Sequence, residues 1–392
     1  MSQALSVYLN LLRFLAALAV YLFHAQWFAR FSLPYIGNFG SEAVLVFFVL
    51  SGVLITSSGI RQPNGRAFLR ARVVRLWSVG LPALMLTMAA DTIGQHILLS
   101  AYEPMQPYDT LKWLVSIVIN SLFLNQVWNV NVYAGTNGPF WSLSYEFWYY
   151  IMFAGWLYFS GKKRIGALAC AALIAGPSIV IGFPIWLMGS AAYFAMVRTR
   201  ASTFIGWTCW LGSIAIALTF LAIDMDKLLV KAFPTIAADA KWKVDFWPES
   251  YSLGLLVAIN IFGFSVIGKS FGSLLARFSQ VIRLGADISF GLYLFHYPLM
   301  YLAKAILHNA GLTTGATYAT IVYAAPLGIS AALAIQCERH KNWVGIVIDR
   351  VAEKANTWIW GHSQSPKSIV LTDPLQHPPS SVHIQNEDKI LF

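Results

Sequence analysis

Residues 43–56 read AVLVFFVLSGVLIT, a stretch without a charged side chain that lies inside the longer apolar run 40–60. Similar runs follow one another along most of the chain, and about 20 apolar residues are enough for a helix to cross a bilayer. We place the transmembrane spans at 5–28, 40–60, 77–99, 141–160, 165–182, 183–197, 202–223, 250–270, 287–307 and 315–336. This succession predicts an all-α polytopic membrane protein with about ten transmembrane helices.

The composition excludes an ordinary soluble protein. Of the 392 residues, 57% are hydrophobic and only 11% are charged, with a mean hydropathy of +0.60, whereas soluble domains carry about 25% charged residues. The net charge of +10 does not indicate a nucleic-acid partner, because the basic residues cluster in short segments between apolar runs. Cys170, Cys209 and Cys337 lack the spacing of a metal site or a disulfide framework. We therefore expect no metal and no resident cofactor.

Basic side chains concentrate in alternate loops, as the positive-inside rule expects of cytoplasmic loops. These loops hold Arg61, Arg66, Arg70, Arg72, Arg75, Lys162, Lys163, Arg164, Arg198, Arg200, Lys269, Arg277 and Arg283. The bias predicts that both termini are cytoplasmic. The run 111–128 contains Lys112, Asn120 and Asn125, and counting it as a span would place residues 162–164 outside. We therefore expect a re-entrant or interfacial segment there.

Two parts of the chain differ in composition. Residues 1–340 form the predicted transmembrane domain, and residues 341–392 are polar and rich in proline toward their end, which predicts a disordered cytoplasmic tail. The first apolar run has no positive charge before Arg13 and is too long for a signal peptide, so we expect it to remain as a span.

Two ionisable side chains share one face of the first span. Arg13 and His24 are eleven positions apart, and eleven helical steps of about 100° return to within about 20° of the start, with a rise of about 16 Å. An ionisable side chain inside a span is a functional candidate because its charge is costly in lipid. A histidine can take a proton from a hydroxyl nucleophile, whereas an arginine stays charged and can hold an anion. The alternative is an arginine that extends to the membrane surface and a histidine that packs against another helix.

A basic segment precedes the third span. Residues 66–77 read RAFLRARVVRLW, and Arg72 and Arg75, three apart on a helix, share a face on which guanidinium groups can hold phosphates. Arg70 lies beside them. The alternative is simple anchoring by the positive-inside rule, which explains the bulk of the charge.

The fourth span opens with an acidic side chain. Residues 137–150 read NGPFWSLSYEFWYY, in which the aromatic residues alone would be typical of a membrane-interface belt. Glu146 is not explained in that way and needs a partner. We expect His24 or an arginine, because a carboxylate beside a histidine orients the ring and stabilises its protonated form.

A second intramembrane histidine lies in the ninth span. Residues 288–299 read ISFGLYLFHYPL, with Tyr293 one turn before His296. The alternative to a functional role is a packing histidine with one hydrogen bond. Three further polar residues within spans, Asp91, His96 and Lys304, are less informative, and we leave them outside the predicted site.

These motifs together resemble the membrane-bound acyltransferase-3 family. The Arg13/His24 pair, the run 46–55, the Arg72/Arg75 pair, residues 140–146 and residues 289–296 appear in the family's order, over roughly residues 5–340. The resemblance implies an O-acyltransferase in a bacterial inner (plasma) membrane. Such an enzyme moves an acyl group, usually acetyl, from cytoplasmic acyl-CoA to a hydroxyl of a sugar or polysaccharide-type acceptor.

The resemblance also implies roles for single residues. His24 is the expected catalytic base, Arg13 its partner, and Glu146 the acidic residue of the Trp-Ser-Leu-x-x-Glu motif. The expected acyl-CoA contacts are Arg70, Arg72 and Arg75, and the supporting residues are Ser51, Trp141, Ser142, Tyr293 and His296. Two departures stand out: Ser78 occupies the place of a proline common in the family, and we expect no appended esterase-like domain.

Other functions remain compatible with the same intramembrane charges. A transporter or flippase of a lipid-linked saccharide or small anion is the main alternative, and a silent scaffold beside polysaccharide-assembly proteins is a third. Within the acyltransferase hypothesis, the sequence is compatible with acetyl or succinyl transfer. It is also compatible with direct transfer or transfer through an acyl-histidine.

Overall fold

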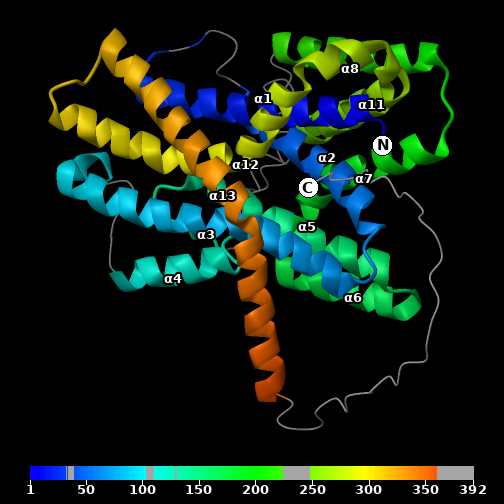
Figure 1. Cartoon of the computed structure of the whole chain (residues 1–392), viewed down its shortest axis with the longest axis horizontal. Coiled ribbons are helices and arrows are strands. Elements are labelled where there is room, and N and C mark those ends of the chain that lie inside the picture. Colours follow the sequence, from blue (N-terminus) through cyan, green and yellow to red (C-terminus); the bar gives the residue numbers. More distant parts are fainter. Residues whose placement is uncertain (32, 34–38, 103–109, 129, 224–247, 360–392) are drawn as a thin grey trace, which may run out of the picture. The chain divides into compact units, whose positions relative to one another are not determined.

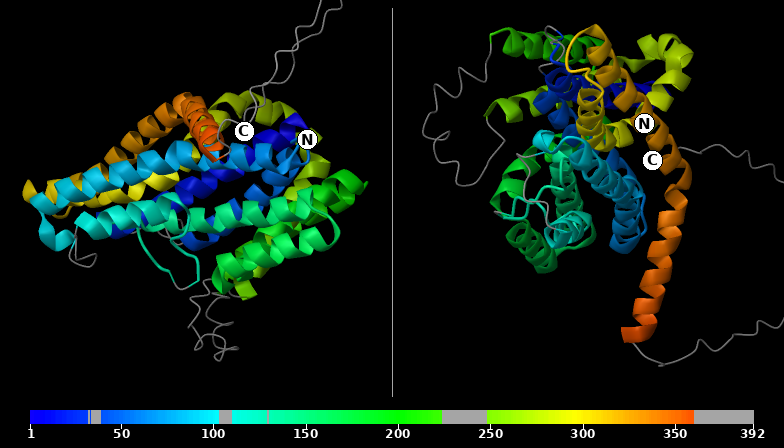
Figure 2. Two further views of the ribbon diagram at one scale, coloured as in Figure 1. Left: turned by 90° about the horizontal axis from the view of Figure 1, so that it is seen from below. Right: turned by 90° about the vertical axis from the view of Figure 1, so that its left-hand side faces the viewer.

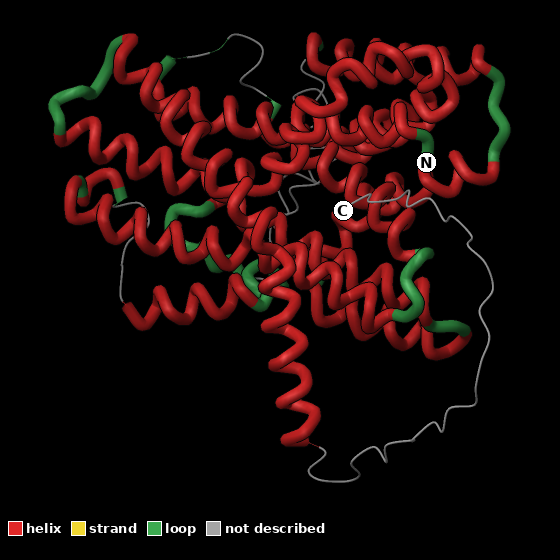
Figure 3. The backbone as a smooth tube through the Cα atoms, in the orientation of Figure 1, coloured by secondary structure: helices red, strands yellow, loops and turns green. Residues whose placement is uncertain are grey.

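The computed structural model describes residues 1–31, 33, 39–102, 110–128, 130–223 and 248–359. Regular structure in these residues is helical (Figure 3), apart from one isolated bridge between Ala134 and Asn137. The contacts divide the chain into a first unit, Met1–Ile348, and a second, Asp349–Phe392. The first unit holds all the predicted site residues.

Eleven α-helices build the described part of the chain (Figure 1). They are α1 (Gln3–Ala29), α2 (Gly40–Gly59), α3 (Gly65–Ile97), α4 (Thr110–Ser121), α5 (Trp141–Tyr158), α6 (Gly161–Ala175), α7 (Pro177–Arg198), α8 (Thr203–Ala222), α11 (Pro248–Ile267), α12 (Gly272–Asn309) and α13 (Ala316–Ile359). Among the described residues, seven helical stretches are long and apolar enough to cross a membrane, one of which, Ser250–Asn309, includes most of α11 and all of α12. The protein is therefore an all-α, multi-pass integral membrane protein, as the sequence predicts.

Several predicted boundaries are wrong. The break placed between residues 182 and 183 lies at Gly176, whose φ of 84° ends α6 before Pro177 opens α7, because glycine tolerates that backbone and proline suits a first helical turn. The basic segment before the third span belongs to the same 33-residue helix as the span, α3. The predicted spans at α5 and α6 form helices of 18 and 15 residues that do not reach the length and hydropathy of the seven stretches.

Two segments outside the predicted spans also have definite structure. Residues 110–121 form α4, a helix of 12 residues, which is too short to cross a bilayer. The expected disorder from residue 341 onward is wrong as far as Ile359, because α13 continues to that residue. Its apolar residues Val344, Val347, Ile348 and Val351 recur at helical spacing. Residues 360–392 lie outside the described part.

The first helix is central to the first unit. It packs most extensively against α12 and then against α2, while α12 also packs on α3 (Figures 1 and 2). Helices α2 and α7 approach closely at Gly52 and Gly189, where an added Cβ would overlap backbone atoms of the partner helix. Small residues permit such close packing where lipid surrounds the helices. This arrangement places the histidine of α1 against the histidine of α12.

Candidate active site

His24 and His296 form a hydrogen-bonded pair between α1 and α12. The distance from Nδ1 of His24 to Nε2 of His296 is 2.9 Å, and the two rings stack with their centroids 5.1 Å apart. His296 is fully buried, and its Nδ1 lies 2.8 Å from the carbonyl oxygen of Leu292. The two predicted histidines are thus brought together across 272 positions of sequence.

This chain of contacts determines which nitrogens carry protons. A carbonyl oxygen only accepts hydrogen bonds, so Nδ1 of His296 must be the donor to Leu292. In a neutral ring the other nitrogen is then an acceptor, and Nε2 of His296 accepts from Nδ1–H of His24. The remaining nitrogen of His24, Nε2, is consequently left with a lone pair that can accept a proton.

A cavity of about 520 Å³ lies beside this pair. Its lining comes from α1, α2, α11, α12 and the segment that opens α5, and it includes His24, Trp141 and Tyr293. The volume is within the range of small-molecule sites, about 300–1,000 Å³. The cavity therefore offers room for a substrate next to the histidine of α1.

A buried carboxylate holds the loop 134–140, of which Gly138 and Pro139 line the cavity. Asp91 accepts hydrogen bonds from the backbone N–H of Thr136 at 2.8 Å and from its hydroxyl at 2.6 Å. The amide of Asn137 donates to Thr87 at 3.0 Å and to the carbonyl of Leu294 at 2.9 Å. Asp91, which the sequence did not assign to the site, fixes the loop that precedes α5.

The start of α5 is joined to α12 by hydroxyl groups. Ser142 and Tyr293 share a hydrogen bond of 2.9 Å, and both hydroxyls also lie within hydrogen-bonding distance of the Pro139 carbonyl, at 3.2 and 3.1 Å. Trp141 lies on the cavity side of the same turn and packs edge-on against Tyr145. These predicted supporting residues position the cavity wall relative to the histidine pair.

Glu146 was expected to pair with His24 or an arginine. Its carboxylate does not contact His24, and it acts electrostatically on Arg13 and Arg72. Its Oε1 accepts hydrogen bonds from the hydroxyl of Ser51, at 3.0 Å, and from that of Tyr150. The indole N–H of Trp186 donates to Ser51 at 3.1 Å. The rotation of α5 about its axis directs the Glu146 carboxylate toward Ser51 of α2. His296, not Glu146, lies beside His24.

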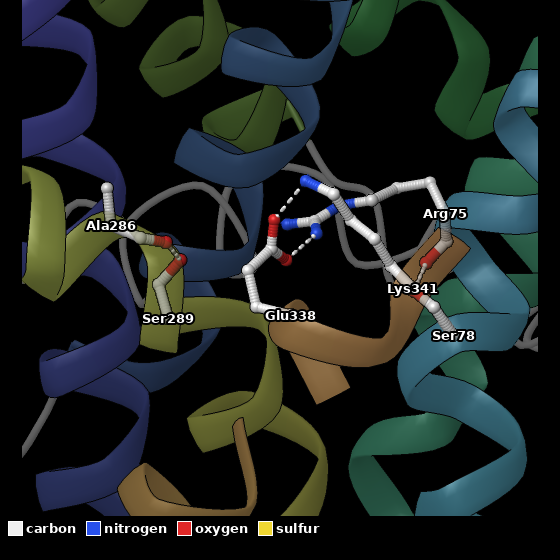
Figure 4. Close-up of polar contacts among 6 residues, drawn as sticks. All are labelled: Arg75, Ser78, Ala286, Ser289, Glu338 and Lys341. Carbon is white, nitrogen blue, oxygen red and sulfur yellow. Dashed lines mark hydrogen bonds and ion pairs between the residues drawn. The ribbon is translucent and has the colours of Figure 1, made fainter. Parts of the chain in front are cut away.

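The predicted arginines lie in a separate cluster. Arg75 binds Glu338 of α13 at 2.6 Å, and Lys341 binds the other oxygen of that carboxylate at 2.5 Å (Figure 4). Arg72 is 8% exposed, with its guanidinium 5.9 Å from the ring centre of Phe68. Arg70 is exposed and donates to the carbonyl of Gly345 at 3.4 Å. The three arginines thus have different surroundings and do not form one phosphate-facing row.

Arg13 lies on the same helix as His24 and within electrostatic range of Arg75 and Glu338. The charged groups that act on it electrostatically include Arg75, Glu146 and Glu338. Because Arg13 and His24 are eleven residues apart on one helix, a rise of about 16 Å separates their backbone positions. Arg13 and His24 therefore lie at two different levels along α1, separated by that rise.

Sequence reasoning missed four residues of this region. They are Glu42 and Tyr297 on the cavity wall, Asp91 behind the loop and Glu338 beside Arg75. The only sequence signal was an ionisable residue at the edge of, or inside, an apolar run, and that signal does not name a partner.

The comparisons with known proteins identify the family. A family model described as an acyltransferase domain matches residues 6–335. The chain therefore belongs to the acyltransferase-3 family, a membership that the order of its motifs predicts.

Three curated relatives carry names that agree with this membership. The chain is 31% identical over 228 residues to acyltransferase MdmB of Streptomyces mycarofaciens, covering 56% of each protein. It is 30% identical over 148 residues to an O-acetyl transferase of Shigella phage Sf6, covering 36% of this chain and 42% of that protein. Nodulation protein 10 of Rhizobium leguminosarum bv. viciae is 24% identical over 327 residues, covering 76% and 83%. The chain thus matches about half the length of the first two relatives. No solved structure gives a significant match.

Proposed function

We propose that this protein is an O-acyltransferase that moves an acetyl-type group from acyl-CoA to a hydroxyl of a sugar or polysaccharide-type acceptor. The observation that carries the proposal is the His24–His296 pair beside the cavity. A neutral histidine with a lone pair on Nε2 has the protonation state that a general base requires. Membership of the acyltransferase-3 family supports the reaction class.

In the proposed transfer, His24 alone carries the proton from the acceptor hydroxyl to the leaving thiolate. Nε2 of His24 takes the proton of the acceptor hydroxyl as its oxygen attacks the thioester carbonyl carbon. The new C–O bond forms, the C–S bond breaks, and the imidazolium returns the proton to the CoA thiolate. His296, which accepts from Nδ1–H of His24, stabilises the positive ring in the interval. In this direct mechanism no acyl group is bound to the enzyme.

Donor and acceptor would enter at opposite ends. The acyl-CoA phosphates would bind near Arg70, Arg72 and Arg75 on the cytoplasmic side, and Arg13 would anchor the donor on its way toward His24. Guanidinium groups suit phosphate recognition because they present several N–H donors in a fixed plane. We place both termini in the cytoplasm and the protein in a bacterial inner membrane, with polysaccharide-assembly proteins as possible neighbours.

The proposal is tested in cells by mass spectrometry of surface glycans. A strain lacking the gene should lose an acyl mass, which the wild-type gene should restore and the His24→Ala variant should not. The His308→Ala variant is a matched control because His308 is exposed in the last turn of α12, and it should restore the mass. Full acylation with His24→Ala at normal protein level would contradict the proposed base.

A further inference from the structure

Tyr293 lies on the cavity wall one helical turn before His296. Tyr293 and His24 both line the cavity, and Tyr293 is three positions before His296 on α12, a rise of about 4.5 Å. His296 is in turn hydrogen-bonded to His24. A phenol and the proposed base therefore border the same space.

Tyr293 and Ser142 together have one hydroxyl proton more than the carbonyl between them requires. The Pro139 carbonyl oxygen lies 3.1 Å from the Tyr293 hydroxyl and 3.2 Å from the Ser142 hydroxyl, and the two hydroxyls lie 2.9 Å apart. A carbonyl oxygen only accepts, so one of the two protons is enough to give it a partner. When Ser142 donates to Pro139, the proton of Tyr293 can point to Ser142 or to an oxygen atom in the cavity. Tyr293 can therefore donate to a ligand without leaving the carbonyl unpaired.

The other two tyrosines on the cavity wall have different surroundings. Tyr297 packs edge-on against the ring of His24, with the centroids 4.7 Å apart, and its hydroxyl is hydrogen-bonded with Tyr301. Tyr133 is 49% exposed, whereas Tyr293 is 6% exposed. A donor that is buried and already held in place is the kind that stabilises a developing charge most effectively, because it need not reorganise during the reaction.

We propose that Tyr293 is the hydrogen-bond donor to the oxyanion that forms during acyl transfer, and that Ser142 is a positioning residue that acts through Tyr293. The inference rests on the proposed function, in which the acceptor hydroxyl attacks the thioester beside His24. As the new C–O bond forms, the π electron pair of the thioester carbonyl moves to its oxygen. Tyr293 donates a hydrogen bond to that oxygen and keeps its own proton. The pair then re-forms the C=O bond, and the C–S bond breaks with its electrons on sulfur, which takes the proton from His24.

Removal of the phenol hydroxyl tests the inference, with labelled acetyl-CoA and p-nitrophenyl β-glucoside as substrates for the purified protein in nanodiscs. Tyr293→Phe keeps the ring, and we expect it to lower kcat by about 100-fold, as the loss of one oxyanion donor does. The KM for each substrate should stay within about threefold of the wild type, because the donor acts on the transition state and not on substrate binding.

Tyr318→Phe is the matched control. The buried Tyr318 hydroxyl also donates to a carbonyl, that of Phe28, at 2.9 Å, but Tyr318 lies outside the described lining of the cavity. This variant should keep the kcat of the wild type. The Tm of each variant in detergent shows whether the fold is retained.

A double-mutant cycle separates the proposed role from simple anchoring of the loop. Ser142→Ala leaves Tyr293 as the donor to both the carbonyl and the oxyanion, and we expect kcat to fall by about tenfold. Because Ser142 acts through Tyr293, the double variant should match Tyr293→Phe within about threefold. If both hydroxyls only anchored the loop, the two losses would multiply and the KM for the glucoside would rise, since Gly138 and Pro139 line the cavity.

The outcomes for the two proposals differ. Wild-type kcat in Tyr293→Phe, or losses that multiply with a raised KM, would overturn the role of Tyr293 and leave the proposed enzyme intact. An absence of transfer by the wild type would contradict the proposed function and the role of Tyr293 with it. If Tyr293→Phe had a lowered Tm, Ser142→Ala would decide: an unchanged kcat would overturn the inference, and a loss of about tenfold at unchanged KM would support it.

Discussion

A neutral His24 can act as a base only if its proton sits on the ring nitrogen that faces away from the acceptor. His296 imposes this condition, because the Leu292 carbonyl forces it to present Nε2 as an acceptor to Nδ1–H of His24. We therefore propose that His296 positions and orients His24, and we expect its removal to affect the chemical step rather than substrate binding.

Substitution of His296 tests this role directly. We expect His296→Ala to lower kcat by about 100-fold with little change in KM for either substrate. This loss lies between that caused by removing a residue that only orients a functional side chain and that caused by a catalytic histidine in the wrong tautomer. His296→Gln should recover part of the loss, because its amide oxygen can accept from Nδ1–H. Steady-state kinetics with both substrates measure the two parameters. Equal activity of the Ala and Gln variants would contradict a hydrogen-bonding role.

The sequence predicted the identity of these residues better than their partners. His24, Glu146 and His296 stood out because burying an ionisable side chain in the membrane costs free energy, so that such a residue is a functional candidate. Their pairing depends on how each helix is rotated about its axis, and a nearly uniform apolar sequence contains little information about that rotation. For this reason the sequence left His24 or an arginine as the partner of Glu146, whereas the carboxylate accepts a hydrogen bond from Ser51 of α2.

Helices α2 and α7 pack closely at Gly52 and Gly189, each of which faces the backbone of the other helix. A Cβ on Gly52 would overlap the Trp186 carbonyl, and one on Gly189 would overlap the Val49 carbonyl. We expect Gly189→Ala to destabilise the fold by about 1–3 kcal/mol, as overpacking does. Gly212→Ala is the control, because a Cβ there meets open space. Thermal unfolding in detergent should show a lower Tm for the first variant only.

In the proposed reaction, the contact between α3 and α13 would limit the access of the acyl-CoA donor to Arg75. Glu338 neutralises Arg75 at 2.6 Å, so an anionic donor that binds there meets a competing carboxylate. We expect Glu338→Gln to lower the KM for acyl-CoA by about 3- to 10-fold at unchanged kcat, because one repulsive charge is removed. Arg75→Gln should raise the same KM. A higher KM in Glu338→Gln would show that the carboxylate instead holds Arg75 in its binding position.

Across the whole chain, hydropathy was enough to predict a helical membrane protein, and most predicted spans coincide with helices. Boundaries were less predictable, because apolar runs merge: Gly176 separates α6 from α7, yet no charged residue marks the break. The continuation of α13 to Ile359 was missed because the polar composition after residue 338 was given more weight than its helical periodicity.

Cysteine labelling tests the orientation of the molecule in the membrane. Arg200 and Thr313 are exposed in two loops that the positive-inside rule assigns to opposite sides. In a variant without the native cysteines, we expect a membrane-impermeant maleimide to label Thr313→Cys in intact cells, and to label Arg200→Cys only after lysis. The reverse pattern would invert the proposed topology and exchange the donor and acceptor sides.

The most direct test of the proposed chemistry is acetyl transfer by the purified protein in nanodiscs. Radiolabelled acetyl-CoA is supplied with the p-nitrophenyl glucoside, and the wild type is compared with His24→Ala and with His308→Ala. We predict labelled glycoside with the wild type and with His308→Ala, and a loss of at least about 100-fold with His24→Ala, as expected for a general base. Equal transfer by His24→Ala would contradict the assignment of this histidine, and an absence of transfer by any of the three proteins would contradict the proposed reaction.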